Sequence, residues 1–118
     1  TFQINDLQSK NINIALGTDS LASVTDEDSQ DSLSLFDEMR KLLEGENAVK
    51  PESILKMSTV NGAKALGLHY ETGSLVAGKR ADWISLPWNG KKESLAEHAI
   101  GSLEPVSCVF LGGKEISG

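Results

Sequence analysis

Residues 11–20 read Asn-Ile-Asn-Ile-Ala-Leu-Gly-Thr-Asp-Ser and join an alternating apolar run to one carboxylate, that of Asp19. Apolar side chains recur at every second position, as on the buried face of a β-strand. These are Ile12, Ile14 and Leu16. Parallel α/β barrels place catalytic groups at the C-terminal tips of strands, so we expect a strand that presents Asp19 as a catalytic residue. The alternative is that Asp19 caps the turn or helix that follows.

Helical periodicity follows in the middle of the chain. Residues 32–44 carry apolar side chains at helical spacing, which predicts an amphipathic helix closed by Gly45. Pro51 suits the first position of a second helix. Thr59 is a candidate cap for a further short helix that ends at Gly67. In this helix Asn61 and Gly62 are interpreted as structural rather than catalytic.

Beyond Gly73 the pattern becomes extended. Residues 81–86 and 106–111 are predicted strands, and Gly112-Gly113 is typical of a hairpin turn into residues 114–116. Asp82 is interpreted as a turn residue or a backbone hydrogen-bond partner. Before all of these elements, residues 5–10 predict the end of a short helix or a turn.

Four motifs occur in an order that resembles the amidohydrolase superfamily, in its deaminase and chlorohydrolase branch. The motifs are residues 17–23 (GTDSLAS), 35–40 (LFDEMR), 59–68 (TVNGAKALGL) and 73–82 (GSLVAGKRAD). Together they extend over most of the chain, and an ordered set of four is far more specific than any one of them.

The resemblance implies an α/β chain that is the C-terminal fragment of a (β/α)8 barrel. Residues 1–68 would supply the last barrel strand and its following helices, and residues 69–118 part of a small β-sandwich. A complete barrel takes about 250 residues, whereas this chain has 118. The remainder of the barrel, or another copy of the chain, is therefore an expected partner.

The same resemblance implies a metal-dependent hydrolase acting on non-peptide carbon–nitrogen bonds. Its substrate would be a small heterocyclic molecule, with deamination of a purine-like amine as the leading reaction and dehalogenation as the lesser one. Asp19 would be both a metal ligand and the proton shuttle beside a divalent metal, with zinc expected. Such a metal lowers the pKa of its bound water to about 7.

Metal ligands are few in this chain. A hydrolytic zinc site generally takes three protein ligands, and the sequence contains only two histidines, His69 and His98. Neither belongs to the His-x-His pair that the family carries on its first barrel strand. We therefore expect the isolated chain to hold no catalytic metal and to be inactive.

The charge and the apolar content of the chain limit the classes of partner that it can bind. The formal net charge of −6 disfavours nucleic acid and anionic membranes. No apolar run approaches the roughly 18 residues of a spanning helix, and we expect a cytoplasmic protein. The single cysteine, Cys108, is interpreted as a buried strand residue, and the acidic residues 26–31 as a solvated loop.

A hypothesis from another class competes with the hydrolase. The chain could instead be a small non-catalytic α+β module for assembly or binding, in which Asp19 is only a cap. That interpretation explains the missing histidines, but it gives no reason for four family motifs in series.

Overall fold

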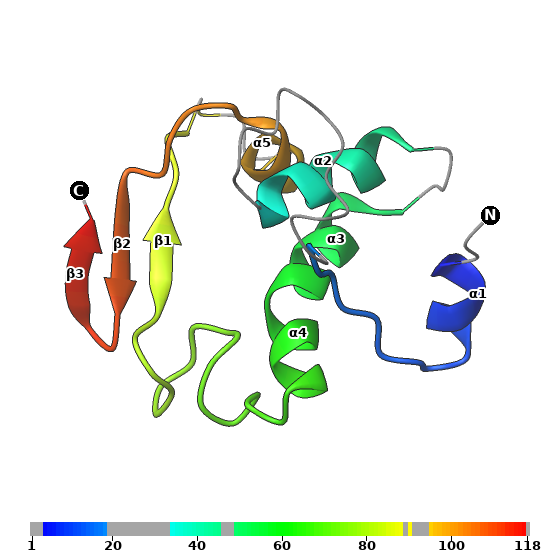
Figure 1. Cartoon of the computed structure of the whole chain (residues 1–118), viewed down its shortest axis with the longest axis horizontal. Helices are drawn as coiled ribbons and strands as arrows, with labels where there is room; N and C mark the ends of the chain where they lie inside the picture. The colour runs from blue at the N-terminus through cyan, green and yellow to red at the C-terminus, as the bar shows by residue number, and fades with distance from the viewer. Residues whose placement is uncertain (1–3, 19–33, 46–48, 89, 91–94, 118) are drawn as a thin grey trace.

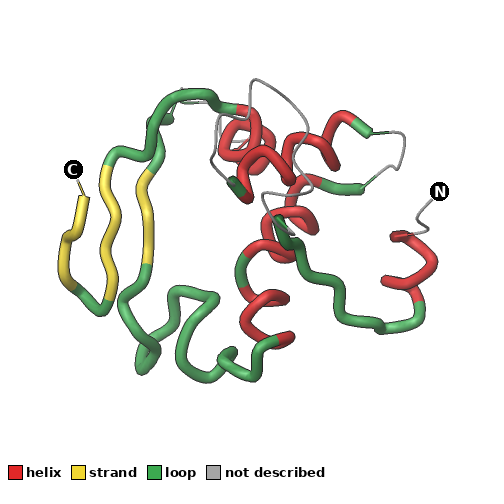
Figure 2. Tube along the Cα trace, viewed as in Figure 1, coloured by secondary structure: helices red, strands yellow, loops and turns green. Residues whose placement is uncertain are grey.

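The computed structural model describes residues 4–18, 34–45, 49–88, 90 and 95–117. In chain order its elements are α1 (Ile4–Ser9), α2 (Leu35–Glu44), α3 (Pro51–Ser58), α4 (Val60–Ala65), β1 (Trp83–Ser85), α5 (Leu95–Gly101), β2 (Cys108–Leu111) and β3 (Lys114–Ser117). The sheet stands at one side of the molecule and the helices lie at the other (Figures 1 and 2). In the described part, no helix has the length and apolar character needed to cross a membrane.

The hydrophobic core lies among α2, α3 and α5, which all contact one another. Ile54 and Met57 of α3 and Ile100 of α5 are completely buried, and Met39 of α2 packs with them. The amphipathic helix predicted at 32–44 is therefore confirmed from Leu35 onward, because its apolar stripe supplies this core. Residues 32 and 33 lie outside the described part.

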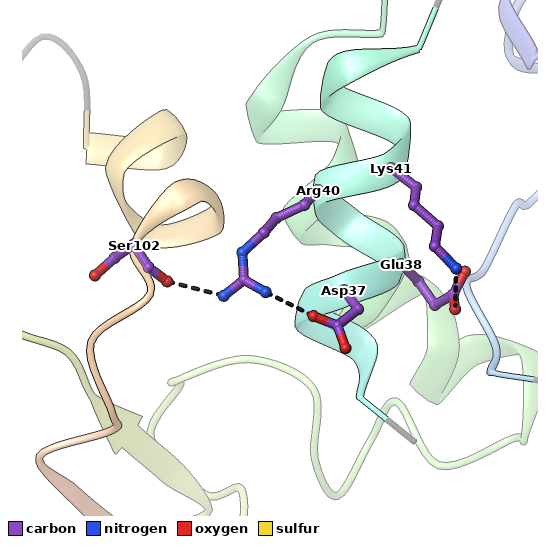
Figure 3. A network of polar contacts seen from close by, with 5 residues as sticks. All are labelled: Asp37, Glu38, Arg40, Lys41 and Ser102. Atoms are coloured by element: carbon purple, nitrogen blue, oxygen red, sulfur yellow. Dashed lines mark hydrogen bonds and ion pairs between the residues drawn. The ribbon is translucent and has the colours of Figure 1, made fainter. Parts of the chain in front are cut away.

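Arg40 links α2 to α5 across the rim of this core (Figure 3). Its guanidinium donates 2.8 Å hydrogen bonds to the carbonyl oxygen of Ser102 and to the carboxylate of Asp37. The bond to Ser102 joins residues 62 positions apart, directly after α5 ends. A polar side chain therefore fixes how the two helices sit against each other.

Two helices end in the same way. After α1, Asn11 adopts a left-handed backbone (φ 59°), and the N–H of Ile12 bonds the Leu7 carbonyl at 3.1 Å. After α4, Gly67 has φ 73°, and the N–H of Leu68 bonds the Ala63 carbonyl at 2.8 Å. Both are Schellman-type ends, in which a left-handed residue turns the chain back over the last carbonyls. The predicted stop at Gly67 is confirmed.

The prediction for Thr59 was only half right. α3 begins at Pro51 as predicted, and Thr59 does separate α3 from α4. Its side chain makes no cap bond to α4, however, and its hydroxyl donates instead to the Leu55 carbonyl at 2.8 Å. The last carbonyls of α3 have no partners inside their own helix, and the Thr59 hydroxyl satisfies one of them.

The sheet is antiparallel, in the order β1-β2-β3. Both predicted strands are confirmed but are shorter than 81–86 and 106–111. Gly112 (φ 60°) and Gly113 (φ 81°) form the predicted hairpin turn, since both have the positive φ that a tight two-residue turn needs. Trp83 of β1 stacks on Phe110 of β2, with ring centroids 4.3 Å apart.

The strand predicted at residues 12–16 is not observed. Residues 12–18 have no regular secondary structure, because no neighbouring strand pairs with them in the described part of the chain. Ile14 and Leu16 pack against the core as the alternation predicted, but Ile12 is 48% exposed. A strand needs a partner as well as a pattern, and the pattern alone leaves this segment irregular.

Candidate active site

The segment that leads to Asp19 is held by the junction of α3 and α4. The backbone N–H of Leu16 donates to the Met57 carbonyl at 3.0 Å. The side-chain amide of Asn61 donates to the Ile14 carbonyl, and that of Asn13 donates to the Asn61 carbonyl, both at 3.0 Å. Three hydrogen bonds therefore fix residues 13–16 against the helices.

Asp19 itself lies outside the described residues, as does the acidic stretch 26–31. The last described residue before it is Thr18. The structure therefore defines the path of the chain up to the residue before the candidate catalytic acid, and the role of Asp19 stays a prediction.

The interpretation of Asn61 as structural agrees with its contacts, because it binds backbone and side-chain groups of another segment. Sequence reasoning missed which segment that would be. The residues it joins are 47 and 48 positions apart, so no periodicity relates them. The usable signal was a polar side chain among small residues in 59–68, which marks a helix that another segment approaches closely.

The two histidines serve separate local contacts. His98 of α5 is half-buried, with Nε2 2.7 Å from the carbonyl oxygen of Pro87. His69 lies beside the ring of Tyr70, and its buried Nδ1 has no hydrogen-bond partner among the described residues. Within the described ranges, no three His, Cys, Asp or Glu side chains gather where a metal ion could be held.

Asp82 is confirmed as a backbone hydrogen-bond partner. Its carboxylate accepts from the backbone N–H of Gly112 at 2.8 Å and from the Thr72 hydroxyl at 3.1 Å, and lies 3.3 Å from Arg80 Nε. The bond from Gly112 is the largest cause that lowers the pKa of Asp82, and Thr72 and Arg80 lower it further against the opposing effect of desolvation. The carboxylate of Asp82 is therefore a structural partner of the hairpin turn.

Cys108 is a strand residue as predicted, although it is half-buried rather than fully buried. Its Sγ lies 3.0 Å from the Ser85 hydroxyl on the neighbouring strand β1, where the two residues are in register. The thiol therefore contributes to the contact between β1 and β2.

A groove of about 760 Å³ lies between the α3–α4 pair and the sheet. Most of its lining is apolar, with Leu16, Met57, Leu75, Trp83 and Phe110 among the contributors. Its hydroxyl and carboxyl side chains are already hydrogen-bonded within the chain: Ser58, Thr59, Thr72, Ser74 and Asp82. The groove therefore offers packing surface rather than catalytic groups.

A family model, described as the amidohydrolase family, matches residues 1–116. The chain belongs to the amidohydrolase family. Among its relatives is the 5-methylthioadenosine/S-adenosylhomocysteine deaminase of Teredinibacter turnerae, which is 40% identical over 93% of this chain and 26% of its own length.

Two solved deaminase structures have the same local fold. Aminofutalosine deaminase of Helicobacter pylori matches with a TM-score of 0.78 and 29% identity, over 98% of this chain and 28% of that one. An adenosine deaminase of Xanthomonas campestris, solved with bound zinc, matches with a TM-score of 0.71 and 29% identity, over 92% and 26%. The chain thus spans about a quarter of the length of these relatives.

The match bears on the two hypotheses drawn from the sequence. All three relatives are deaminases, so the amidohydrolase resemblance and its deaminase branch are confirmed. The α/β class is confirmed as a small piece with a three-stranded antiparallel sheet, while the complete barrel and the sandwich remain predictions. None of the three is named as a binding module.

Proposed function

We propose that the complete protein containing this chain is a hydrolase that deaminates purine-like nucleosides. The observation that carries the proposal is the 40% identity to a 5-methylthioadenosine/S-adenosylhomocysteine deaminase over 93% of the chain. The anchored segment 13–16, which runs toward Asp19, supports it, because a catalytic acid needs a fixed approach.

The reaction requires one proton acceptor near the amine-bearing ring carbon. Water adds to this carbon, the carbon–nitrogen bond breaks, and the products are a ring carbonyl and ammonia. Asp19 would accept a proton from the water and pass it to the departing nitrogen. A positioned general acid or base of this kind contributes roughly a hundred- to ten-thousandfold to the rate.

The described residues do not fit a catalytic zinc site, because no three ligands gather among them. A zinc-bound adenosine deaminase among the solved relatives supports zinc as the metal of the complete protein. In that protein Asp19 would be the ligand that this chain gives to the zinc ion. The histidine ligands would come from the rest of the protein. The 118 residues alone are expected to bind no catalytic zinc and to release no ammonia.

We keep the division at residues 68 and 69, with the barrel portion before it and the sandwich portion after it. The groove between the two portions supports the need for a covering partner, because apolar side chains on its walls are largely exposed, such as Leu66 (76%) and Leu75 (75%). The remainder of the barrel or another copy would cover them. The cytoplasm stays our expectation for where the protein acts.

The test replaces Asp19 by Asn in the complete protein and measures ammonia release from adenosine, 5′-methylthioadenosine, S-adenosylhomocysteine and aminofutalosine. We expect turnover to fall at least about a hundredfold with folding intact. Asp82→Asn is the matched control, because it changes an acid that is bonded to Gly112. It should retain turnover per folded molecule.

Two results would contradict the proposal. Full turnover by Asp19→Asn with normal metal content would remove this residue from the mechanism. No ammonia from any of the four nucleosides with the wild-type protein would reject purine deamination, and halide release from a chlorinated heterocycle would then favour dehalogenation.

A further inference from the structure

Asn61 and the pair Asn13–Ile14 exchange hydrogen bonds in both directions. The Asn61 amide donates to the Ile14 carbonyl at 3.0 Å, and the Asn13 amide donates to the Asn61 carbonyl at 3.0 Å. Side-chain amides here play the part that backbone N–H groups play between paired strands. The segment before Asp19 is thus bonded to a helix rather than to a strand of the described chain.

The helix break beside Asn61 makes this contact possible. Thr59 leaves helical geometry (φ −124°, ψ −97°), which ends α3 and exposes its last carbonyls. One of them, that of the fully buried Met57, accepts the N–H of Leu16 at 3.0 Å. Residues 13, 14 and 16 therefore all form hydrogen bonds with the region where α3 ends and α4 begins.

We propose that Asn61 is a positioning residue for the catalytic acid, an inference that rests on the function proposed above. Only five positions separate Ile14 from Asp19. We therefore expect that a change at Ile14 affects where the acid is held. Misplacement of a catalytic group by about 1 Å can cost roughly a hundredfold in rate.

The chemistry of Asn suits this position. The side-chain nitrogen of Asn61 donates to the Ile14 carbonyl, while its backbone carbonyl accepts from the side chain of Asn13. Asp at position 61 would keep the shape, but its ionised carboxylate could only accept, and it would face the Ile14 carbonyl oxygen. Ala would remove the donor without adding a charge.

The experiment uses the complete protein and the nucleoside that it deaminates fastest, with the variants Asn61→Ala and Asn61→Asp. We expect kcat to fall roughly ten- to a hundredfold in both variants. KM should change less than about threefold, because no substrate contact is removed. Hydrogen exchange at the backbone amides of residues 14–18 should become faster.

Thr59→Ala is the matched control. It removes a 2.8 Å hydrogen bond at the same helix junction, but that bond goes to Leu55 and not to the segment before Asp19. It should lower stability while leaving kcat per folded molecule and exchange at residues 14–18 unchanged. This contrast separates positioning from a general loss of stability.

Each adverse result has a distinct meaning. Normal kcat in Asn61→Ala, or an equal loss in Thr59→Ala, would overturn the positioning role while deamination itself stood. A wild-type protein that deaminates none of the nucleosides would overturn the proposed function and this inference with it.

Discussion

Asp82 accepts a 2.8 Å hydrogen bond from the backbone N–H of Gly112, thirty positions further along the chain. Gly112 lies in the turn between β2 and β3, and Asp82 directly precedes β1. The same carboxylate accepts from Thr72 and pairs with Arg80. One acid therefore ties the sheet's last turn to the loop that precedes its first strand.

The first prediction concerns the pH dependence of Asp82. The folded protein lowers its pKa, chiefly through the Gly112 N–H, so the ionised form stabilises the fold above the unfolded pKa near 4. That stability is lost as the pH falls through the lowered folded value. Asp82→Asn should be less stable than wild type at pH 7, and the difference should shrink below about pH 4. Urea denaturation of both proteins at several pH values measures it.

Thr72→Ala is the control for this prediction. It removes one hydroxyl partner and keeps the carboxylate and its bond from Gly112. It should lower stability and still lose further stability in acid. An Asp82→Asn protein whose deficit stays constant down to pH 2.5 would contradict the assigned role.

The second prediction concerns Gly73, where a loop approaches α4. A Cβ at Gly73 would lie 2.8 Å from the Cβ of the buried Ala63, and the backbone there has φ 98°. Gly78 has nearly the same backbone (φ 95°) with no atom within 4 Å of its Cβ position. Gly73→Ala should therefore be less stable than Gly78→Ala by about 1–3 kcal/mol, the usual cost of overpacking. Equal unfolding free energies would show that the loop shifts freely.

The third prediction compares two neighbouring cations of α2 (Figure 3). Arg40→Met should lower the free energy of unfolding by about 1–2 kcal/mol, because it removes a charged bond to the Ser102 carbonyl and keeps most of the apolar stem. Lys41→Met should change it by less than about 0.5 kcal/mol, because Lys41 is 73% exposed and lies 3.5 Å from its partner Glu38. Thermal or urea unfolding measures both, and a larger effect at Lys41 would reverse this assignment.

Local chemistry explains the predictions that were confirmed. The apolar stripe of α2 follows from apolar residues that recur with the helical period of about 3.6 residues per turn. Met39 lies on this stripe and is buried. Pro51 begins α3 because its missing N–H costs nothing at a helix start. Gly112-Gly113 turns the hairpin because both glycines accept positive φ. Each of these signals is complete within a few residues.

One error came from a segment whose partners are distant in the sequence, and the other from a residue with two possible local partners. Alternation predicted a strand at 12–16, but the described chain supplies helix groups there instead of a second strand. Thr59 had the right residue type for a cap, yet its hydroxyl bonds back to Leu55. A side chain with two possible hydrogen-bond partners binds the one that the fold brings within reach. The local sequence does not show which of the two this will be.

The sequence by itself determined the helices α2, α3 and α4, the hairpin and the family, because periodicity, turn residues and ordered motifs are local features of the chain. It did not predict α5, and its assignment of Asp19 as the catalytic acid stays a prediction. The tertiary structure alone decided which distant groups meet. Asn61 bonds to Ile14, Arg40 to Ser102, and Asp82 to Gly112, across 47, 62 and 30 positions. Such pairs leave no periodic trace, because a hydrogen bond depends on where folding places two groups and not on their spacing along the chain.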